Sequence, residues 1–363
     1  MGERGPARAA LALISPSDAL VNLPEVLAKL PKAELHLHLE GSIEPPTVVE
    51  LAARHGVAVN VAEAEARYNY ADFAGFLDAF KWVTAFLRTP ADYVLVAERL
   101  VDRLIEQRLL YTEITLSVGV MLLRGQNPEE NFAALDAVAQ RASARGLTLR
   151  WVFDAVRQFC ADAAMEVARW AARFRKYGVV AFGMGGDELA LPAAEFRDVY
   201  AFARGEGLHC LVHAGEVGGP QSVRDAIEQL GAERIGHGIG ASADPELMRV
   251  LAERRIPLEI CPTSNLRTGA LAQLLGKPKA AIEEHPVHQL FERGVPITIS
   301  TDDPAMFRAS LLGEYALLER LGFSPREIAQ VARKSIEVGF LEESWKRTLL
   351  SGFDDLARFY GLV

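Results

Sequence analysis

The sequence predicts an α/β protein, and within that class a (β/α)₈ barrel of the TIM type. Three observations lead to this fold class. Eight short runs rich in β-branched and aromatic residues alternate with longer segments of helical periodicity. Polar residues gather at the ends of several of these runs, where a barrel carries its site. No G-x-G-x-x-G motif follows the first run, which weakens the case for an open dinucleotide-binding sheet.

The strand candidates follow one another at the spacing expected of β/α units. They occupy residues 32–39, 109–118, 147–156, 178–186, 207–216, 233–239, 256–264 and 295–303. The segments between them place apolar residues at helical spacing, as in "NPEENFAALDAVAQRASARG", which ends with a glycine. Alternating strands and helices of this kind form a parallel sheet.

One connection is longer than the others. Residues 40–108 separate the first two strands and contain two amphipathic helix patterns, "ADFAGFLDAFKWVTAFL" and "ADYVLVAERLVDRLIEQ". An insertion after the first strand lies at the carboxyl end of the barrel, so we expect a helical cover over the site; the alternative is ordinary packing in the outer ring. We expect residues 1–363 to form a single domain, in which residues 1–22 are an N-terminal arm.

The bulk composition excludes several classes of function. The formal net charge is −9, which argues against non-specific binding to nucleic acid and to anionic membranes. No apolar run is long enough to span a bilayer, and the short apolar run near the N-terminus fits a flexible arm better than a secretory signal. The three widely spaced cysteines predict reduced thiols, and with them a cytoplasmic protein.

The chemistry-bearing residues stand at the ends of separate strands. The first strand ends with His36 and His38, and the fifth ends with His213 and Glu216. The sixth carries His237, and the eighth ends with Asp302 and Asp303. In a closed barrel these ends meet on one face, so the sequence predicts that they form a common site.

The pair "HLH" has a physical explanation in this setting. Side chains two apart on a strand share a face, so both imidazoles of His36 and His38 point into the barrel, where they need polar partners. A bound metal ion would be such a polar partner for both imidazoles, and His213 and Asp302 would be its further ligands. Three imidazoles and a carboxylate suit one Zn²⁺ per chain with a position left for water, although iron, cobalt or manganese could substitute.

The other histidines are assigned ordinary structural places. His55 precedes a glycine and fits a helix end, and His209 lies near a strand start, away from the site. His285 and His288 are expected on a surface helix before the last strand.

The motifs "KAELHLHLEGS", "GGDE", "HAGE", "RIGHG", "CPTSN" and "STDDP" occur in an order that resembles the adenosine deaminase family of the amidohydrolase superfamily. The resemblance implies a metal-dependent aminohydrolase that acts at C6 of a 6-aminopurine through activated water. It assigns the metal to His36, His38, His213 and Asp302, the water to His237, and protonation of N1 to Glu216. Asp303 would hold N7, and the backbone N–H of Gly186 would hold N3.

The substrate within the family depends on two further positions. Family members that act on adenosine carry Asp in the motif H-x-H-L-D-G, where this chain has Glu40, so recognition of the 5′ end differs. Arg157, after the third strand, is expected either to pair with a substrate carboxylate or to be a surface arginine, or one paired with Asp154 or a helix carboxylate. By resemblance we rank 6-aminodeoxyfutalosine first, which places the enzyme in menaquinone biosynthesis. Adenosine ranks second and adenine third, both in purine salvage.

Two other classes of function remain as alternatives. One is a metal-dependent hydrolase of another bond, and the other is a non-catalytic ligand-binding barrel. The fourth strand ends in "FGMGGDE" without the lysine that bridges two metals in some amidohydrolases, and Glu216 is present, which favours a one-metal deaminase. The expected partner is a small molecule, neither nucleic acid nor membrane, and the oligomeric state is left open.

Overall fold

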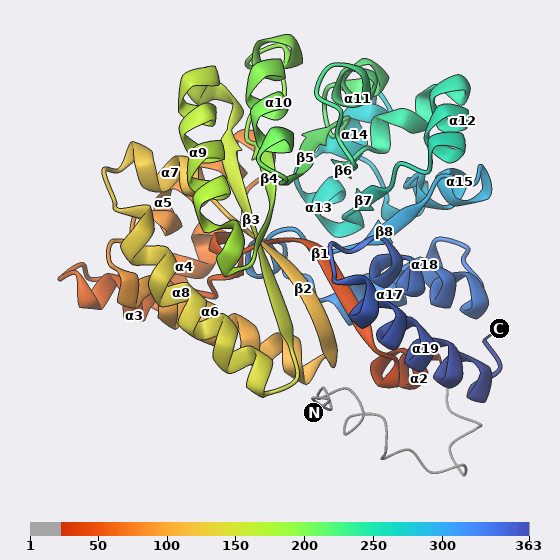
Figure 1. Cartoon of the computed structure of the whole chain (residues 1–363), viewed down its shortest axis with the longest axis horizontal. Helices are drawn as coiled ribbons and strands as arrows, with labels where there is room; N and C mark the ends of the chain where they lie inside the picture. The colour runs from red at the N-terminus through yellow and green to blue at the C-terminus, as the bar shows by residue number, and fades with distance from the viewer. Residues whose placement is uncertain (1–22, 363) are drawn as a thin grey trace.

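An eight-stranded parallel barrel organises residues 23–362, which are the residues that the computed structural model describes (Figure 1). The strands are hydrogen-bonded in sequence order from β1 to β8. Their bounds are β1 Lys32–His38, β2 Leu109–Leu116, β3 Thr148–Val156, β4 Val179–Gly185, β5 His209–Ala214, β6 Arg234–His237, β7 Leu258–Ile260 and β8 Ile297–Ile299. The fold class predicted from the alternation of strands and helices is confirmed.

The last two strands are much shorter than the apolar runs that predict them. The run 256–264 contains only three strand residues, because Pro262 begins helix α13 directly after Cys261. Strand β8 ends at Ile299. The polar residues Thr301 and Asp302 follow outside the strand and lead into the site.

Helices and short 3₁₀ turns connect the strands. In the first half they are α2 Leu23–Lys29, η2 Glu40–Ser42, α3 Pro45–Arg54, α4 Val61–Arg67, α5 Phe73–Thr84, α6 Pro90–Glu106, α7 Val118–Leu123, α8 Pro128–Ala144, η3 Arg157–Phe159, α9 Cys160–Phe174 and η4 Arg175–Tyr177. In the second half they are η5 Ala193–Phe196, α10 Arg197–Gly205, α11 Gly219–Glu228, η6 Ile239–Ala243, α12 Pro245–Arg254, α13 Pro262–Arg267, α14 Ala270–Leu274, η7 Ile282–Glu284, α15 Val287–Glu292, α16 Pro304–Phe307, α17 Leu311–Arg320, α18 Pro325–Val338 and α19 Glu343–Phe359.

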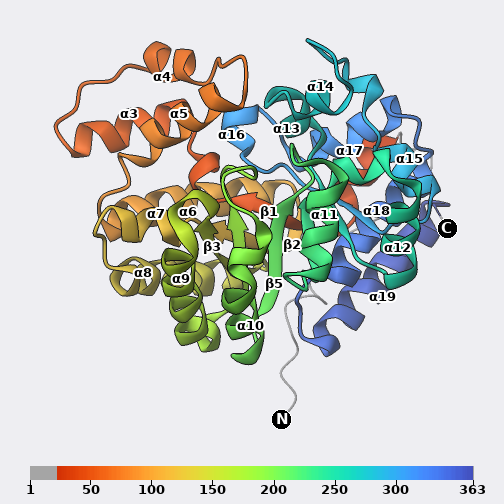
Figure 2. The same ribbon diagram turned by 90° about the horizontal axis from the view of Figure 1, so that it is seen from above.

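The long connection between β1 and β2 divides into two parts. Figure 2 shows α3, α4 and α5 gathered at one end of the barrel, beyond the strands. Phe73, Phe76 and Phe80 of α5 line the cavity at the strand ends, while the predicted role of this segment as a cover stays a prediction. Helix α6 instead packs against α8 and β2, so this part of the segment 40–108 belongs to the outer ring.

A seam between β1 and the residues after β8 closes the barrel. Leu37 and Asp302 form a parallel bridge, in which the His38 N–H donates to Asp302 O at 2.9 Å and the Asp302 N–H donates to His36 O at 3.0 Å. Side chains complete the seam, since Ser300 Oγ accepts from the N–H of His36 at 3.2 Å. The seam therefore sets His36, His38 and Asp302 beside one another.

A charged cluster fills the barrel interior below the site. The buried guanidinium of Arg234 on β6 forms ion pairs with Glu113 on β2 and with Glu259 on β7, the latter with 2.6 Å between Nε and Oε1. It also lies 3.9 Å from the centre of the Phe340 ring. Two carboxylates in such a setting require their cation, because an unpaired buried charge is strongly destabilising.

Several further expectations can be compared with the structure. The arm 1–22 lies outside the described residues. All three cysteines are free thiols, as predicted, with Cys210 and Cys261 buried. Among the described helices, none has both the length and the apolar character needed to cross a bilayer.

We expect Arg234→Met to lower the melting temperature by roughly 4–7 °C, because it leaves two buried carboxylates uncompensated at a cost of about 3–5 kcal/mol. Differential scanning calorimetry measures the shift. The matched control is Arg249→Met on α12, whose ion pairs with Glu246 and Glu253 are exposed and contribute little. Equal shifts in the two variants would contradict the importance of the buried cluster.

Candidate metal and substrate site

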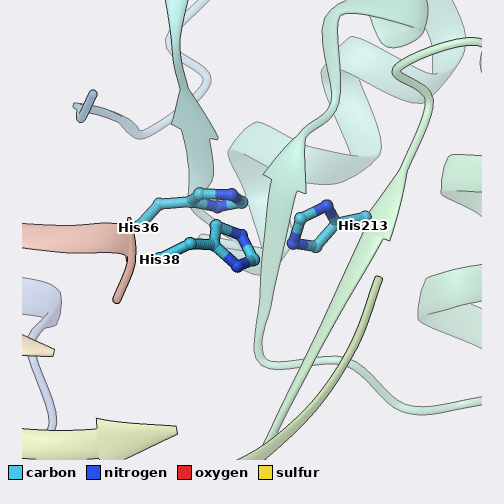
Figure 3. Close-up of side chains that lie close together, drawn as sticks. All are labelled: His36, His38 and His213. Atoms are coloured by element: carbon cyan, nitrogen blue, oxygen red, sulfur yellow. The ribbon is translucent and has the colours of Figure 1, made fainter. Parts of the chain in front are cut away.

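Three histidines converge at the carboxyl end of the barrel (Figure 3). His36 and His38 extend from β1 and His213 extends from β5, and their rings point toward one another. The ring centres of His36 and His213 are 4.6 Å apart, and those of His38 and His213 are 5.3 Å apart. The register of β1 against β2 shifts between Glu34 and Leu37, a stretch that includes His36. The two residues of the "HLH" pair therefore share the interior face, as the period of a strand predicts.

Asp302 joins the histidines from across the seam. Its Oδ1 atom lies 3.3 Å from His36 Nε2 and 3.4 Å from His38 Nε2. Asp302 has a φ of +64°, a left-handed conformation that is strained for a residue with a side chain. Strain of this kind persists where the surrounding structure enforces it and is common at functional sites.

The donor set fits a divalent metal. The buried Nε2 of His36 has no hydrogen-bond partner among the described residues, which is costly for a polar atom unless a ligand satisfies it. One nitrogen from each of His36, His38 and His213 lies within 4.8 Å of the others. The separations of 3.3 and 3.4 Å from Asp302 match the spacing of about 3.4 Å between ligand atoms that tetrahedral bonds of about 2.1 Å imply.

Two residues behind the ligands orient them, and the sequence alone did not identify either. Glu259 Oε2 lies 3.0 Å from His36 Nδ1, which leaves Nε2 of that ring directed toward Asp302. Burial alone would raise the pKa of Glu259, but Arg234 and His36 hold it below its ordinary value, so this carboxylate stays ionised. Ser264 donates to Asp302 Oδ2 at 2.7 Å. Partners of this kind fix the orientation of metal-binding side chains.

Glu216 and His237 stand on the other side of the histidine cluster. Glu216 Oε2 lies 3.6 Å from His237 Nε2, and Thr268 donates to Glu216 Oε1 at 3.3 Å. Burial, together with the nearby Asp302, raises the pKa of Glu216 to about 8, and burial lowers the pKa of His237 to about 3. The structure thus sets a carboxyl that holds its proton beside a neutral imidazole.

A hydrogen-bonded pair behind His237 corrects one expectation. His285 does not lie on the surface; it is buried, and its Nε2 donates to Asn265 Oδ1 at 3.2 Å. Asn265 Nδ2 in turn donates to His237 Nδ1 at 3.1 Å. The motif "CPTSN" carries Ser264 and Asn265, so it was a signal for both residues. Nothing local marks His285, because its partner lies 20 positions away.

A cavity of about 140 Å³ opens onto these residues. Its inner wall contains His38, His213, Glu216, His237, Asp302 and Asp303, together with Asp154 and Gly186. Its outer wall is mainly apolar, with Phe73, Phe76, Leu77 and Phe80 from α5 and with Val120, Val156 and Phe159. The predicted catalytic and purine-binding residues therefore line a single cavity.

Asp303 is closely packed within this wall. Its Oδ1 atom is buried without a hydrogen-bond partner among the described residues, so it is available to a ligand. A Cβ atom at Gly41 would lie 1.6 Å from this oxygen, which explains why glycine follows Glu40 in the chain. Gly186 reaches the cavity with a φ of +91°, a conformation that glycine adopts without strain.

The two predicted specificity residues lie outside the cavity lining. Glu40 is buried, and its Oε1 accepts from the N–H of Ser117 at 2.9 Å. Arg157 is also buried, and its guanidinium donates to the backbone oxygens of Leu191 and His213, each at 3.3 Å. The Arg157 guanidinium is thus hydrogen-bonded to two backbone carbonyl oxygens. These contacts do not favour the expected pairing with a substrate carboxylate.

A model of the adenosine deaminase family matches residues 31–356. The chain is 39% identical over 349 residues to an aminodeoxyfutalosine deaminase of Streptomyces coelicolor, covering 94% of this chain and 88% of the relative. It is 34% identical over 326 residues to an adenine deaminase of Sinorhizobium medicae, covering 89% of this chain and 98% of the relative.

The fold is also found among solved structures. The crystal structure of an adenine deaminase from Arthrobacter aurescens superposes with a TM-score of 0.84 at 26% identity. The match covers 91% of this chain and 99% of that one. Similarity in sequence and in structure therefore extends over nearly the whole barrel.

We expect His213→Gln to lose most of its bound divalent metal, because the change removes one of the imidazoles that hold it. Metal content after gel filtration, determined by plasma mass spectrometry, measures the loss. His209→Gln is the matched control, since His209 begins the same strand but pairs with Glu233 away from the site. Retention of one metal per chain in His213→Gln would contradict the assignment.

Proposed function

The chain belongs to the adenosine deaminase family, whose members are metal-dependent hydrolytic deaminases of aminopurines, and we propose that its substrate is 6-aminodeoxyfutalosine. Water would replace the C6 amino group, giving futalosine and ammonia, as a step of menaquinone biosynthesis. The observation that carries this proposal is the identity of 39% to an aminodeoxyfutalosine deaminase over 94% of the chain.

The metal that best fits the donor set is Zn²⁺, held by His36, His38, His213 and Asp302. When bound, it supplies a Lewis acid that lowers the pKa of water and makes hydroxide available near neutral pH. His237 faces the same space from β6 and would orient the attacking water. The Asn265 amide, which is hydrogen-bonded to His237 Nδ1, keeps the ring turned that way.

Glu216 would donate the proton that the purine ring requires. Attack at C6 places negative charge on N1, and a carboxylic acid within hydrogen-bond reach removes that charge as it develops. The Glu216 carboxyl suits this role, because it is buried in the cavity wall and protonated near neutral pH in the metal-free chain. Proton transfer to the amino group then allows ammonia to leave.

The remaining contacts would hold the purine ring in place. Asp303, with its unpartnered Oδ1, is available to N7, and the backbone N–H of Gly186 is available to N3. Phe73, Phe76 and Phe80 of α5 line the apolar side of the cavity, where the rest of the substrate would pack against them. Lys81 lies in the same lining and carries a positive charge close to this wall. A substrate larger than a free base would make use of these groups.

Deamination of adenine, the substrate ranked third from the sequence, is a further candidate function. The observation that favours it is the identity of 34% to an adenine deaminase, over 89% of the chain. A free base would leave the apolar wall of α5 without a ligand, which is the physical reason for ranking this substrate lower. Adenosine lies between the two candidates, since it fills the cavity only as far as its ribose.

We expect kcat/KM for 6-aminodeoxyfutalosine to exceed that for adenosine and adenine by about tenfold or more, because burying the extension against α5 adds at least about 1.4 kcal/mol to transition-state binding. Ammonia release by zinc-loaded protein, assayed side by side on the three compounds, measures the ratio. Faster turnover of adenosine or adenine would overturn the substrate assignment and leave the reaction class intact.

We expect Glu216→Gln to lower kcat by about 10²–10⁴-fold on any aminopurine, because the amide cannot supply the proton to N1. Its metal content should match that of the unaltered chain, since Glu216 is not among the proposed ligands. Glu228→Gln, an exposed change on the following helix, is the matched control for loss of a charge. A Glu216→Gln variant with normal kcat would show that another group acts as the acid.

A further inference from the structure

The loop after β4 is bonded to the loop that carries Glu216. Glu188, in the motif "GGDE", is buried, and its carboxylate accepts from three backbone N–H groups. They are those of Gly215, of Val217 at 2.7 Å, and of Gly218 at 2.9 Å. These three residues flank Glu216 on both sides, so the carboxylate of Glu188 holds the backbone on which the proposed acid stands.

Arg157 connects the loop after β4 to the end of β5, just before the loop that carries Glu216. Its guanidinium donates to Leu191 O, in the loop after β4, and to His213 O, near the end of β5. Arg157 and Glu188 are both buried, and each is directed at backbone atoms. Arg157 contacts residues that precede Glu216 in the chain, whereas Glu188 contacts residues on both sides of Glu216.

The backbone of this loop is shaped for the close approach of Glu188. A Cβ atom at Gly218 would lie 2.6 Å from Glu188 Oε1, so a larger residue there would displace the carboxylate. Gly218 also precedes α11, whose first N–H groups have no partner within the helix and favour a negative charge. An ionised carboxylate therefore suits this position better than a neutral amide.

The side chain of Glu216 itself makes few polar contacts. Its carboxylate accepts a hydrogen bond from Thr268 at 3.3 Å and lies 3.6 Å from His237 Nε2. The position of its carboxyl group relative to the substrate thus depends chiefly on where the backbone places its Cα atom. Glu188 is hydrogen-bonded to this backbone on both sides of Glu216, and Arg157 is hydrogen-bonded to it at His213. Gly240 and Gln273 add hydrogen bonds to the carbonyl oxygens of Gly215 and Val217.

We propose that Glu188 and Arg157 are positioning residues, which set Glu216 at the place where it protonates the purine. Neither lies in the cavity lining, so both act through Glu216 and neither touches the substrate. This inference rests on the proposed role of Glu216 as the acid. It also assigns Arg157 to the backbone rather than to a substrate carboxylate.

The first test is Glu188→Gln, which keeps the size of the side chain but turns an amide N–H₂ toward backbone donors. Because a misplacement of about 1 Å can cost about 100-fold in rate, we expect kcat to fall by about that factor while KM and metal content stay unchanged. Glu195→Gln, an exposed change in the same connection, is the matched control. Hydrogen exchange should become faster in peptides that cover residues 214–219 and stay unchanged elsewhere.

Turnover and loop exchange in Glu188→Gln equal to those of Glu195→Gln would overturn the inference. A general rise in exchange across the barrel would also overturn it, because it would show a role in overall stability only. Glu216→Gln, assayed in parallel, separates the two proposals. If Glu216→Gln retains normal turnover, the assignment of the acid fails. If it is inactive while Glu188→Gln is normal, only the positioning role fails.

Arg157→Lys provides a second and independent test. Lysine keeps the charge but cannot donate to two carbonyl oxygens in the same plane. We expect kcat to fall by the same factor on adenosine and on 6-aminodeoxyfutalosine, since the defect lies in the acid and not in substrate recognition. A loss confined to 6-aminodeoxyfutalosine would overturn the positioning role of Arg157 and return it to the substrate site.

Discussion

The seam between β1 and the residues after β8 is the constraint on which the rest of the site depends. The same pair of backbone hydrogen bonds that joins Asp302 to His36 and His38 closes the barrel and assembles three of the four proposed ligands. Asp302 adopts a left-handed backbone conformation at this point, which directs its carboxylate toward the histidine rings. Closure of the fold and formation of the metal site are therefore one structural event.

A chain of buried charges supports the seam from below. His36 contacts Glu259, Glu259 contacts Arg234, and Arg234 contacts Glu113 on the far side of the barrel. Each of these four groups is paired with a neighbour in the chain, so none of them is left as an unpaired buried charge. The orientation of the His36 ring, and with it the direction of its Nε2 atom, thus depends on residues well below the site.

The sequence predicted the barrel and the residues at its strand ends because both follow from local rules. Strand periodicity places His36 and His38 on one face, and a parallel barrel gathers the ends of β1, β5, β6 and β8. The supporting residues could not be found in this way. Glu259, His285 and Glu188 act on partners 20 or more positions away, and their own segments do not reveal those contacts, although Glu188 lies in the motif "GGDE". The orientation of Arg157 also escaped prediction, because a long side chain at a strand end can turn toward either substrate or backbone.

The measurement that tests the central claim most directly is a crystal structure of the zinc-loaded protein with anomalous data collected on both sides of the zinc absorption edge. The account predicts one anomalous peak per chain, bounded by His36 Nε2, His38 Nε2, His213 and Asp302, with Glu259 still hydrogen-bonded to His36. Two peaks in the cavity, or a single peak away from the seam, would contradict the claim that barrel closure builds a one-metal deaminase site.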